Sequence, residues 1–219
     1  DQPQAAMLSA TFRFHDELND FLPPERRCRE FTVPCARVAS VKHMIEALGV
    51  PHTEVGAVLV NGAAAGLERP LTAGDRVEVR PANAPPEGGS LEAPRFVADS
   101  HLGALAKLLR MAGFDTLYCN IYADREIAAI AVNEDRILLS RDRELLKFRE
   151  ITHGCYVHAQ RPMQQFREII DRLALGRSAR PFTRCLECNA PLREIDKSAV
   201  LDRLPPSVKM LRNRFWTCA

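Results

Sequence analysis

The sequence predicts an α/β protein with a parallel sheet, preceded by a smaller domain that is rich in strands. From Arg95 onward, short apolar runs alternate with segments of helical apolar spacing, which is typical of a parallel sheet with connecting helices. The first 82 residues instead contain short alternating segments and one helical pattern. Residues 83–94 are rich in Pro, Gly, Ala and Glu and have the composition of a linker between the two parts.

The overall composition is that of a globular protein, with 46% hydrophobic and 26% charged residues among 219. No apolar run approaches the roughly 18 residues that a membrane-spanning helix needs, so we expect no membrane association. The first ten residues lack a basic segment followed by an apolar one, which favours a cytoplasmic location.

The two parts differ in charge. Residues 1–94 hold nine Lys and Arg against 13 Asp and Glu, a formal charge of −4, whereas residues 95–219 hold 21 against 15, a charge of +6. The second part is therefore the better candidate to bind a polyanion such as nucleic acid. The excess is also small enough to be an ordinary solvated surface.

The N-terminal part is expected to fold as strand, strand, helix, strand and strand. Ser40 is a typical N-cap, and the apolar residues that follow it recur at helical spacing up to Gly49. A turn is expected at Asn61-Gly62. Alternating apolar residues predict the strands, at 11–14, 29–33, 58–60 and 77–79.

This order, with Leu71-Thr72-Ala73-Gly74-Asp75-Arg76-Val77-Glu78-Val79-Arg80-Pro81 at its end, resembles the ubiquitin-like β-grasp sulfur carriers of thiamine and molybdopterin synthesis. The resemblance covers residues 8–82 and implies a β-grasp domain. Those carriers end in Gly-Gly and are activated at the terminal carboxylate. Here Gly88-Gly89 continues into Ser90, and a peptide bond cannot be adenylated. We therefore expect a docking domain for a protein partner rather than a carrier.

In the second part, acids follow two of the predicted strands. Asp99 directly ends the apolar run that begins at Arg95, and Asp142 follows the run Ile137-Leu138-Leu139. Asp124 is expected to be the N-cap of a helix between them. Because the carboxyl ends of parallel strands share one edge of a sheet, we expect the three acids to meet there.

Carboxylate oxygens are suited to Mg²⁺ or Mn²⁺. Hydrolysis of a phosphodiester needs an activated water and stabilised charge on the phosphate, and divalent ions supply both. The three acids therefore predict a metal-dependent nuclease. Asp124 and Asp142 have an alternative role as helix caps, whereas Asp99 has no evident local partner. Candidates for contact with the nucleic acid are Ser100, Lys107, Arg110 and Arg141.

The segment from Arg95 to Thr116, which contains Asp99-Ser100-His101-Leu102-Gly103, is similar to the opening motif of the Mut-seven carboxy-terminal RNase family. Asp124-Arg125-Glu126-Ile127 and Arg136-Ile137-Leu138-Leu139-Ser140-Arg141-Asp142 are similar to its later motifs. This family is a branch of the PIN-like nucleases, and bacterial members often carry a ubiquitin-like domain in front. The resemblance implies Mg²⁺- or Mn²⁺-dependent RNA cleavage, with Asp99, Asp124 and Asp142 as metal ligands.

The last 40 residues contain three of the seven cysteines, Cys185, Cys188 and Cys218. Cys-x-x-Cys spacing predicts a zinc site of the ribbon type, and the family resemblance implies the same ribbon. The fourth ligand does not occur in this sequence, so the ribbon is apparently incomplete. Trp216 and the basic residues before it have two alternatives, contact with single-stranded nucleic acid or packing beneath the ribbon.

The expected organisation is a ubiquitin-like domain at 8–82, a linker at 83–94, a PIN-like nuclease domain at 95–178 and a zinc-ribbon segment at 179–219. The expected function is metal-dependent hydrolysis of RNA, with tRNA or another structured RNA as substrate. The alternative is a non-catalytic module that binds RNA or protein and docks through the ubiquitin-like domain. In that case the acids are only helix caps.

Overall fold

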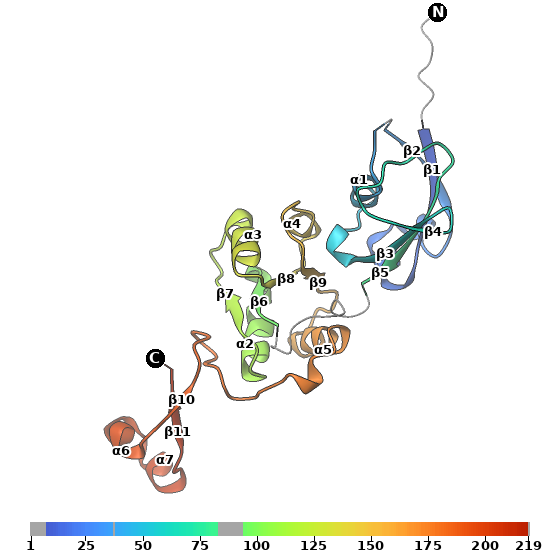
Figure 1. The fold of residues 1–219 in the computed structure, drawn as a ribbon. Helices are drawn as coiled ribbons and strands as arrows, with labels where there is room; N and C mark the ends of the chain where they lie inside the picture. Colours follow the sequence, from blue (N-terminus) through green and yellow to red (C-terminus); the bar gives the residue numbers. More distant parts are fainter. Residues whose placement is uncertain (1–7, 37, 83–93, 219) are drawn as a thin grey trace, which may run out of the picture. The chain divides into compact units, whose positions relative to one another are not determined.

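The computed structural model describes residues 8–36, 38–82 and 94–218, and Figure 1 labels their helices and strands. Contacts divide the chain into two compact units. The first comprises Asp1–Glu87 and Ser140–Tyr156, and the second comprises Gly88–Leu139 and Val157–Ala219. The Gly-Gly pair at 88–89 and most of the expected linker lie outside the described residues.

A five-stranded sheet forms most of the first unit. Its strands are β1 (Leu8–Phe14), β2 (Phe31–Cys35), β3 (Val55–Val60), β4 (Ala63–Ala65) and β5 (Arg76–Pro81), in the order β2-β1-β5-β3-β4. The first and last strands, β1 and β5, are parallel neighbours in the middle, and the outer pairs are antiparallel. This arrangement confirms the predicted β-grasp domain.

Local sequence explains most of this sheet. Inward-facing residues of β1, such as Phe12 and Phe14, are fully buried and alternate with exposed ones, as a strand with one covered face requires. Helix α1 (Val41–Ala47) begins where predicted, since the Ser40 hydroxyl accepts a hydrogen bond from the His43 amide at 3.2 Å. Strand β4 was not predicted, because its three alanines carry no alternating pattern.

The second unit contains the predicted parallel sheet. Strand β6 (Phe96–Ala98) lies between β7 (Thr116–Tyr118) and β8 (Ile137–Ser140), and both pairings are parallel. The strand order in this unit is β7-β6-β8, and strand β9 (Gly154–Tyr156) belongs to the first unit. All three residues of β6 are fully buried, which explains why this strand has no polar alternation.

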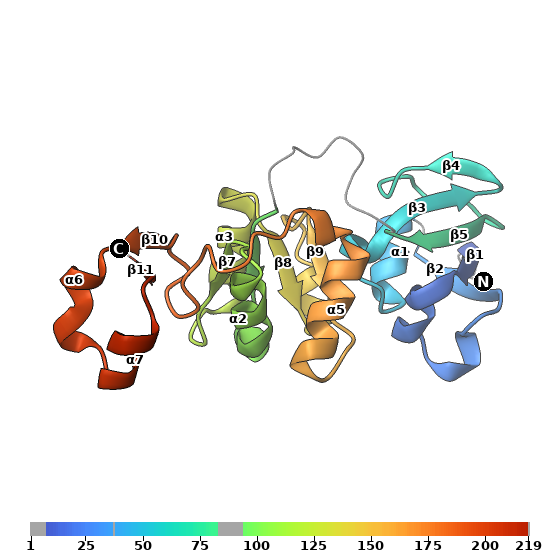
Figure 2. The same ribbon diagram turned by 90° about the horizontal axis from the view of Figure 1, so that it is seen from below.

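Helices follow the strands as predicted. They are α2 (Gly103–Met111), α3 (Asp124–Asn133), α4 (Arg143–Leu146) and α5 (Pro162–Arg172). Helices α2 and α5 pack side by side (Figure 2), and α3 contacts β6. Helix α2 ends at Met111, and Gly113, two residues later, has a φ of +94°, which favours glycine.

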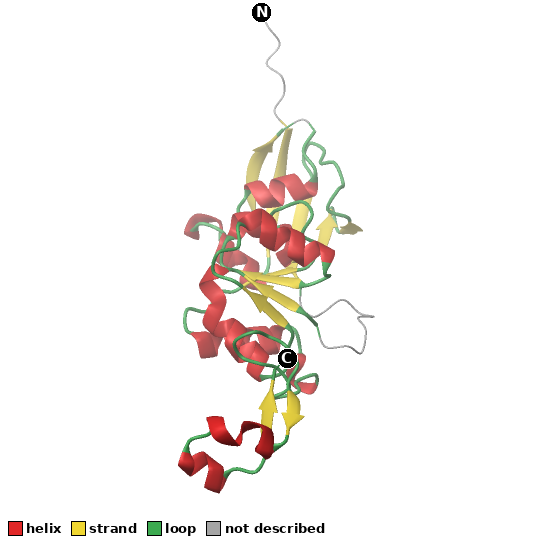
Figure 3. Ribbon diagram, turned by 90° about the vertical axis from the view of Figure 1, so that its left-hand side faces the viewer, coloured by secondary structure: helices red, strands yellow, loops and turns green. Residues whose placement is uncertain are grey.

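The C-terminal segment forms a two-stranded antiparallel ribbon of β10 (Arg193–Ile195) and β11 (Phe215–Thr217). Two short helices, α6 (Lys197–Val200) and α7 (Pro206–Leu211), lie between these strands in the sequence, and Figure 3 shows them as helical turns joined by loops. In the described ranges, no helix has both the length and the apolar character that a membrane crossing requires.

Candidate active site and cysteine cluster

Asp99 lies at the carboxyl end of the central strand β6. Its amide donates to the Leu139 carbonyl of the neighbouring strand at 3.0 Å, and only 6% of the residue is exposed. One carboxylate oxygen, Oδ1, accepts from the His101 amide at 2.8 Å. The expectation that Asp99 has no local partner was therefore wrong, because it caps the 3₁₀ turn Ser100–Leu102. A buried carboxylate held in this way is a fixed acceptor for a cation or a proton.

Asp124 is the first residue of α3, whereas the sequence predicted it to be the N-cap. The N-cap position is occupied by Ala123, which has no side-chain acceptor, and the Glu126 carboxylate instead accepts from the Ala123 amide at 2.8 Å. Asp124 is exposed, and among the described residues its carboxylate has no hydrogen-bond partner. The side chain is therefore available to a ligand.

Asp142 follows β8 by two residues and is the N-cap of α4. Its Oδ1 accepts from the Glu144 amide at 2.8 Å, and the residue is exposed. Its own amide donates to the Ser140 hydroxyl at 2.8 Å, and Ser140 is fully buried. Backbone and side chain of Asp142 are thus both fixed at the end of β8.

Strand register supports a shared edge. Ala98 lies opposite Leu139 in the parallel pair of β6 and β8, so the residues after both strands leave the sheet at its carboxyl edge. Mg²⁺ bound directly by three carboxylates needs their oxygens within about 4.2 Å of one another, because each Mg–O distance is about 2.1 Å. The three aspartates do not form such a cluster in the described part of the chain. Their carboxylate oxygens are nevertheless the type of donor that Mg²⁺ or Mn²⁺ would take.

The expected RNA contacts differ in their surroundings. Ser100 is exposed and its carbonyl accepts from the Tyr118 hydroxyl at 3.1 Å, while Arg141, between β8 and α4, is half-buried. Lys107 is exposed and pairs with Glu187 at 2.8 Å.

Arg110 does not fit the expected RNA contact, because it is 4% exposed. Its guanidinium donates to the carbonyls of Leu186 and Glu187, both at 2.9 Å, and to the Thr116 carbonyl at 2.9 Å. Arg110 therefore attaches the cysteine-bearing loop to α2 and β7.

A second attachment centres on Asp115, which precedes β7. It accepts from Arg136 at 2.7 Å and from the Asn189 side chain at 2.7 Å, and Arg184 lies 3.2 Å away. Burial alone would raise the pKa of Asp115, but the hydrogen bonds and charges of these neighbours lower it overall. No local pattern indicates this network, because its members are up to 74 residues apart.

The three C-terminal cysteines are the only described group of at least three His, Cys, Asp or Glu side chains whose ligand atoms all lie within 4.8 Å. Backbone amides of Cys188 and Glu187 donate to the Cys185 sulfur and lower its pKa to about 7, which favours the thiolate that binds metal. Zn–S distances of about 2.3 Å in a tetrahedron place sulfurs about 3.8 Å apart. Cys185, Cys188 and Cys218 thus fit three ligands of Zn²⁺.

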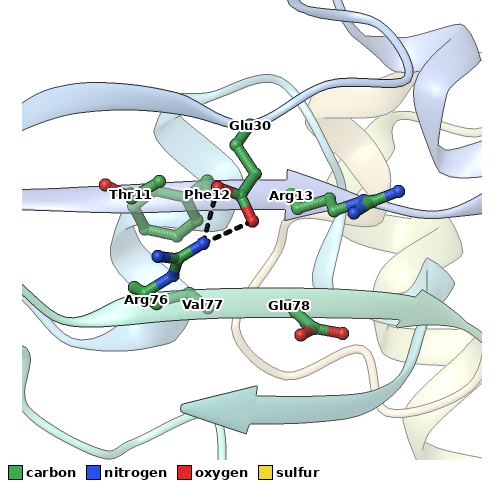
Figure 4. Close-up of a pocket in the computed structure, with 7 residues that line it drawn as sticks. All are labelled: Thr11, Phe12, Arg13, Glu30, Arg76, Val77 and Glu78. Atoms are coloured by element: carbon green, nitrogen blue, oxygen red, sulfur yellow. Dashed lines mark hydrogen bonds and ion pairs between the residues drawn. The ribbon is translucent and has the colours of Figure 1, made fainter. Parts of the chain in front are cut away.

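A small pocket occurs elsewhere, on the sheet of the ubiquitin-like fold. Two of its lining residues form an ion pair, in which Arg76 Nη2 donates to both carboxylate oxygens of Glu30, at 2.8 and 2.7 Å (Figure 4). None of the candidate acids or cysteines lines it; the lining residues are Thr11, Phe12, Arg13, Glu30, Arg76, Val77 and Glu78.

Comparison with known proteins gives two matches to protein families. Residues 94–219 match the model described as the Mut7-C RNAse domain, and residues 7–86 match the one described as Mut7-C ubiquitin. These matches confirm the resemblance and the order of the two domains. A search of curated proteins found no match.

Three solved structures that are similar to this chain each cover about a third of it. Two structures of small archaeal modifier protein 1 from Haloferax volcanii are 22% and 24% identical, span 34% and 37% of this chain and 97% and 99% of their own, and have TM-scores of 0.28. A putative molybdopterin converting factor, subunit 1, from Pyrococcus furiosus is 15% identical, spans 34% of this chain and 97% of its own, and has a TM-score of 0.27. The β-grasp assignment rests on strand order and the family match instead.

Proposed function

Because the chain belongs to the Mut7-C RNAse domain family through residues 94–219, we propose that it is a divalent-metal-dependent ribonuclease that hydrolyses RNA phosphodiester bonds. The observation that carries this proposal is Asp99, a buried carboxylate fixed at the carboxyl end of the central strand of a parallel sheet. Ligand sites of open α/β sheets lie at that edge.

In this proposal Asp99, Asp124 and Asp142 hold Mg²⁺ or Mn²⁺. The ion supplies an activated water and neutralises charge on the phosphate. The His101 amide keeps Asp99 oriented, and the Ser140 hydroxyl fixes the backbone of Asp142. Ser100, Lys107 and Arg141 are the proposed contacts to the RNA strand.

We further propose that Cys185, Cys188 and Cys218 hold a structural Zn²⁺. Their thiols are close enough to share one ion, and the loop that carries two of them is bound by Arg110 and Asp115 through Asn189. The metal would therefore stabilise the attachment of this loop rather than take part in hydrolysis.

The test is cleavage of a mixed pool of labelled RNAs, including tRNA, with Mn²⁺, Mg²⁺ or EDTA. Asp99→Asn keeps an oxygen that accepts from the His101 amide but removes the charge, so we expect a loss of at least about 100-fold in the metal-dependent rate. Asp171→Asn, an exposed acid of α5, is the control and should cleave like wild type. Equal cleavage by Asp99→Asn would contradict the proposed site.

A non-catalytic RNA- or protein-binding module remains the second candidate, since Asp99 and Asp142 both accept backbone hydrogen bonds as caps. It predicts that the wild-type chain binds RNA without cleaving it in any metal. Binding of the same RNA pool by gel shift, measured beside the cleavage assay, distinguishes the two functions.

A further inference from the structure

Residues 140–156 belong in sequence to the nuclease domain, but they form one compact unit with the ubiquitin-like domain. We call this stretch, Ser140–Tyr156, the α4–β9 segment. It contains α4 and β9, and it begins two residues before Asp142. Tyr156 at its end packs against the hydrophobic core of the β-grasp domain. The segment is therefore held by a domain from which it is distant in sequence.

The first contact is made by Arg143, the residue after Asp142. Its Nη1 donates to the Phe21 carbonyl at 3.0 Å, and its guanidinium lies over the Phe21 ring at 4.9 Å and the Tyr156 ring at 5.7 Å. The two rings meet edge to face at 5.1 Å. A hydrogen bond and two cation–π contacts fix the start of α4 against the β-grasp domain.

The second contact comes from the 3₁₀ turn His52–Glu54. Glu54 is fully buried, and its carboxylate accepts from the Tyr156 amide at 2.7 Å. His52 is 9% exposed, and its Nε2 donates to the Ile151 carbonyl at 2.7 Å. A carboxylate is costly to bury unless it is hydrogen-bonded, so the hydrogen bond from the Tyr156 amide offsets part of the cost of burying Glu54.

Close packing adds a third contact. A Cβ on Gly154 would lie 3.3 Å from Thr53 Cγ2 and 2.7 Å from Leu146 Cδ2. A side chain at this position would clash with Leu146 of the same segment, and it would also push Thr53 of the 3₁₀ turn away by a few tenths of an ångström. The segment is thus attached at α4, at Ile151 and along β9, which is enough to fix both of its ends.

We propose that the ubiquitin-like domain is a built-in positioning element of the nuclease, and that Arg143 and Glu54 are the positioning residues that hold Asp142 through the α4–β9 segment. The catalytic role of these residues rests on the proposed function, whereas the contact between the segment and the domain does not. The contacts within the chain add to the expected docking of a protein partner and do not exclude it. A metal ligand displaced by about 1 Å costs about 100-fold in rate, so a fixed segment matters.

The first measurement is hydrogen exchange of the full-length chain, which needs no activity. Arg143→Ala and Glu54→Ala should accelerate exchange of amides 140–156 at least about tenfold. Arg149→Ala, an exposed residue of the same segment, and Glu30→Ala, an exposed acid of the same domain, are the controls and should match wild type. Glu54→Gln keeps an acceptor for the Tyr156 amide and should restore most of the protection.

If Glu54→Ala also accelerates exchange in strands β1 and β5, that variant has unfolded the domain and does not report on the contact. Arg143→Ala then tests the contact, because this substitution leaves no buried charge behind. Unchanged exchange of the segment in Arg143→Ala would overturn the contact.

The second measurement is RNA cleavage by the same variants. Arg143→Ala should lower kcat about 10- to 100-fold and raise the Mn²⁺ concentration for half-maximal rate, with KM for RNA nearly unchanged. Faster exchange with wild-type cleavage would overturn the positioning role. Absence of cleavage by the wild type would refute the proposed function and the positioning role together, while hydrogen exchange still decides whether the contact exists.

Discussion

At the scale of single residues, Asp115 shows how a short turn can anchor a distant loop. It lies between the start of β7 and the cysteine-bearing loop, and contacts Arg136, Arg184 and Asn189. Arg136 is 6% exposed, so it cannot exchange this partner for water. The ion pair is therefore one whose loss leaves a buried charge behind.

We expect Asp115→Ala to lower the free energy of unfolding of the second unit by about 2–4 kcal/mol, because Arg136 then lacks its main buried partner. Hydrogen exchange of the amides of β6 and β8, measured at increasing urea concentration, gives this free energy. The matched control is Glu194→Ala, which removes an exposed ion pair with Arg214 and should have no measurable effect. Similar losses in both variants would contradict a special role for Asp115.

The same residue predicts acid sensitivity. Its pKa is lower in the folded state than the roughly 3.9 of an unfolded Asp, so the unfolded chain binds a proton more readily. The stabilisation is present above about pH 4 and is lost as the pH falls through the folded pKa. The unfolding midpoint in urea, measured from pH 6 to pH 3, should fall less steeply in Asp115→Asn than in wild type.

At the scale of elements, the backbone just after α2 packs closely against residues 180–182. Gly113 has φ +94°, and a Cβ there would lie 2.0 Å from the Arg180 carbonyl oxygen. The chain at 180–182 is held at this point, since the amides of Arg180 and Phe182 donate to the carbonyls of Ala112 and Met111. A side chain at Gly113 must therefore push away the segment that leads to the cysteine cluster.

We expect Gly113→Ala to destabilise the protein by at least about 1 kcal/mol more than Gly74→Ala. Gly74 has a similar φ of +81° but nothing within 4 Å of its added Cβ, so it isolates the conformational cost of roughly 1–2 kcal/mol. Thermal and urea unfolding of the two variants provide the comparison. Equal decreases in the free energy of unfolding would show that residues 180–182 can move away from the added Cβ at no cost.

The cysteine cluster gives a prediction of its own. We expect about one zinc ion per chain by elemental analysis, and a lower content in Cys185→Ser, because the Cys185 thiolate forms near neutral pH. Cys28→Ser, which changes an exposed cysteine of the first unit, should keep the metal. Chelation should also accelerate hydrogen exchange in the loop that Arg110 holds. Equal zinc contents in the two variants would contradict the assignment.

At the scale of the whole molecule, sequence patterns predicted the features that depend on residues close together in the sequence. The parallel sheet, the β-grasp order and the position of Asp99 after β6 follow from runs of apolar residues and the acid that ends one of them. The role of Arg110 could not be predicted, because its acceptors lie 76 and 77 residues away. Nothing local indicates that Glu54 holds the Tyr156 amide, which is 102 residues away.

The pairing of Glu54 with Tyr156 also has a consequence for synthesis on the ribosome. At about 5–20 residues per second, the 102 residues between them take roughly 5–20 s to translate. During that time the β-grasp domain emerges without the hydrogen bond to Tyr156 and without the ring that covers Phe21. A nascent chain stalled before residue 156 thus exposes the face of the Phe21 ring that Tyr156 contacts in the finished protein.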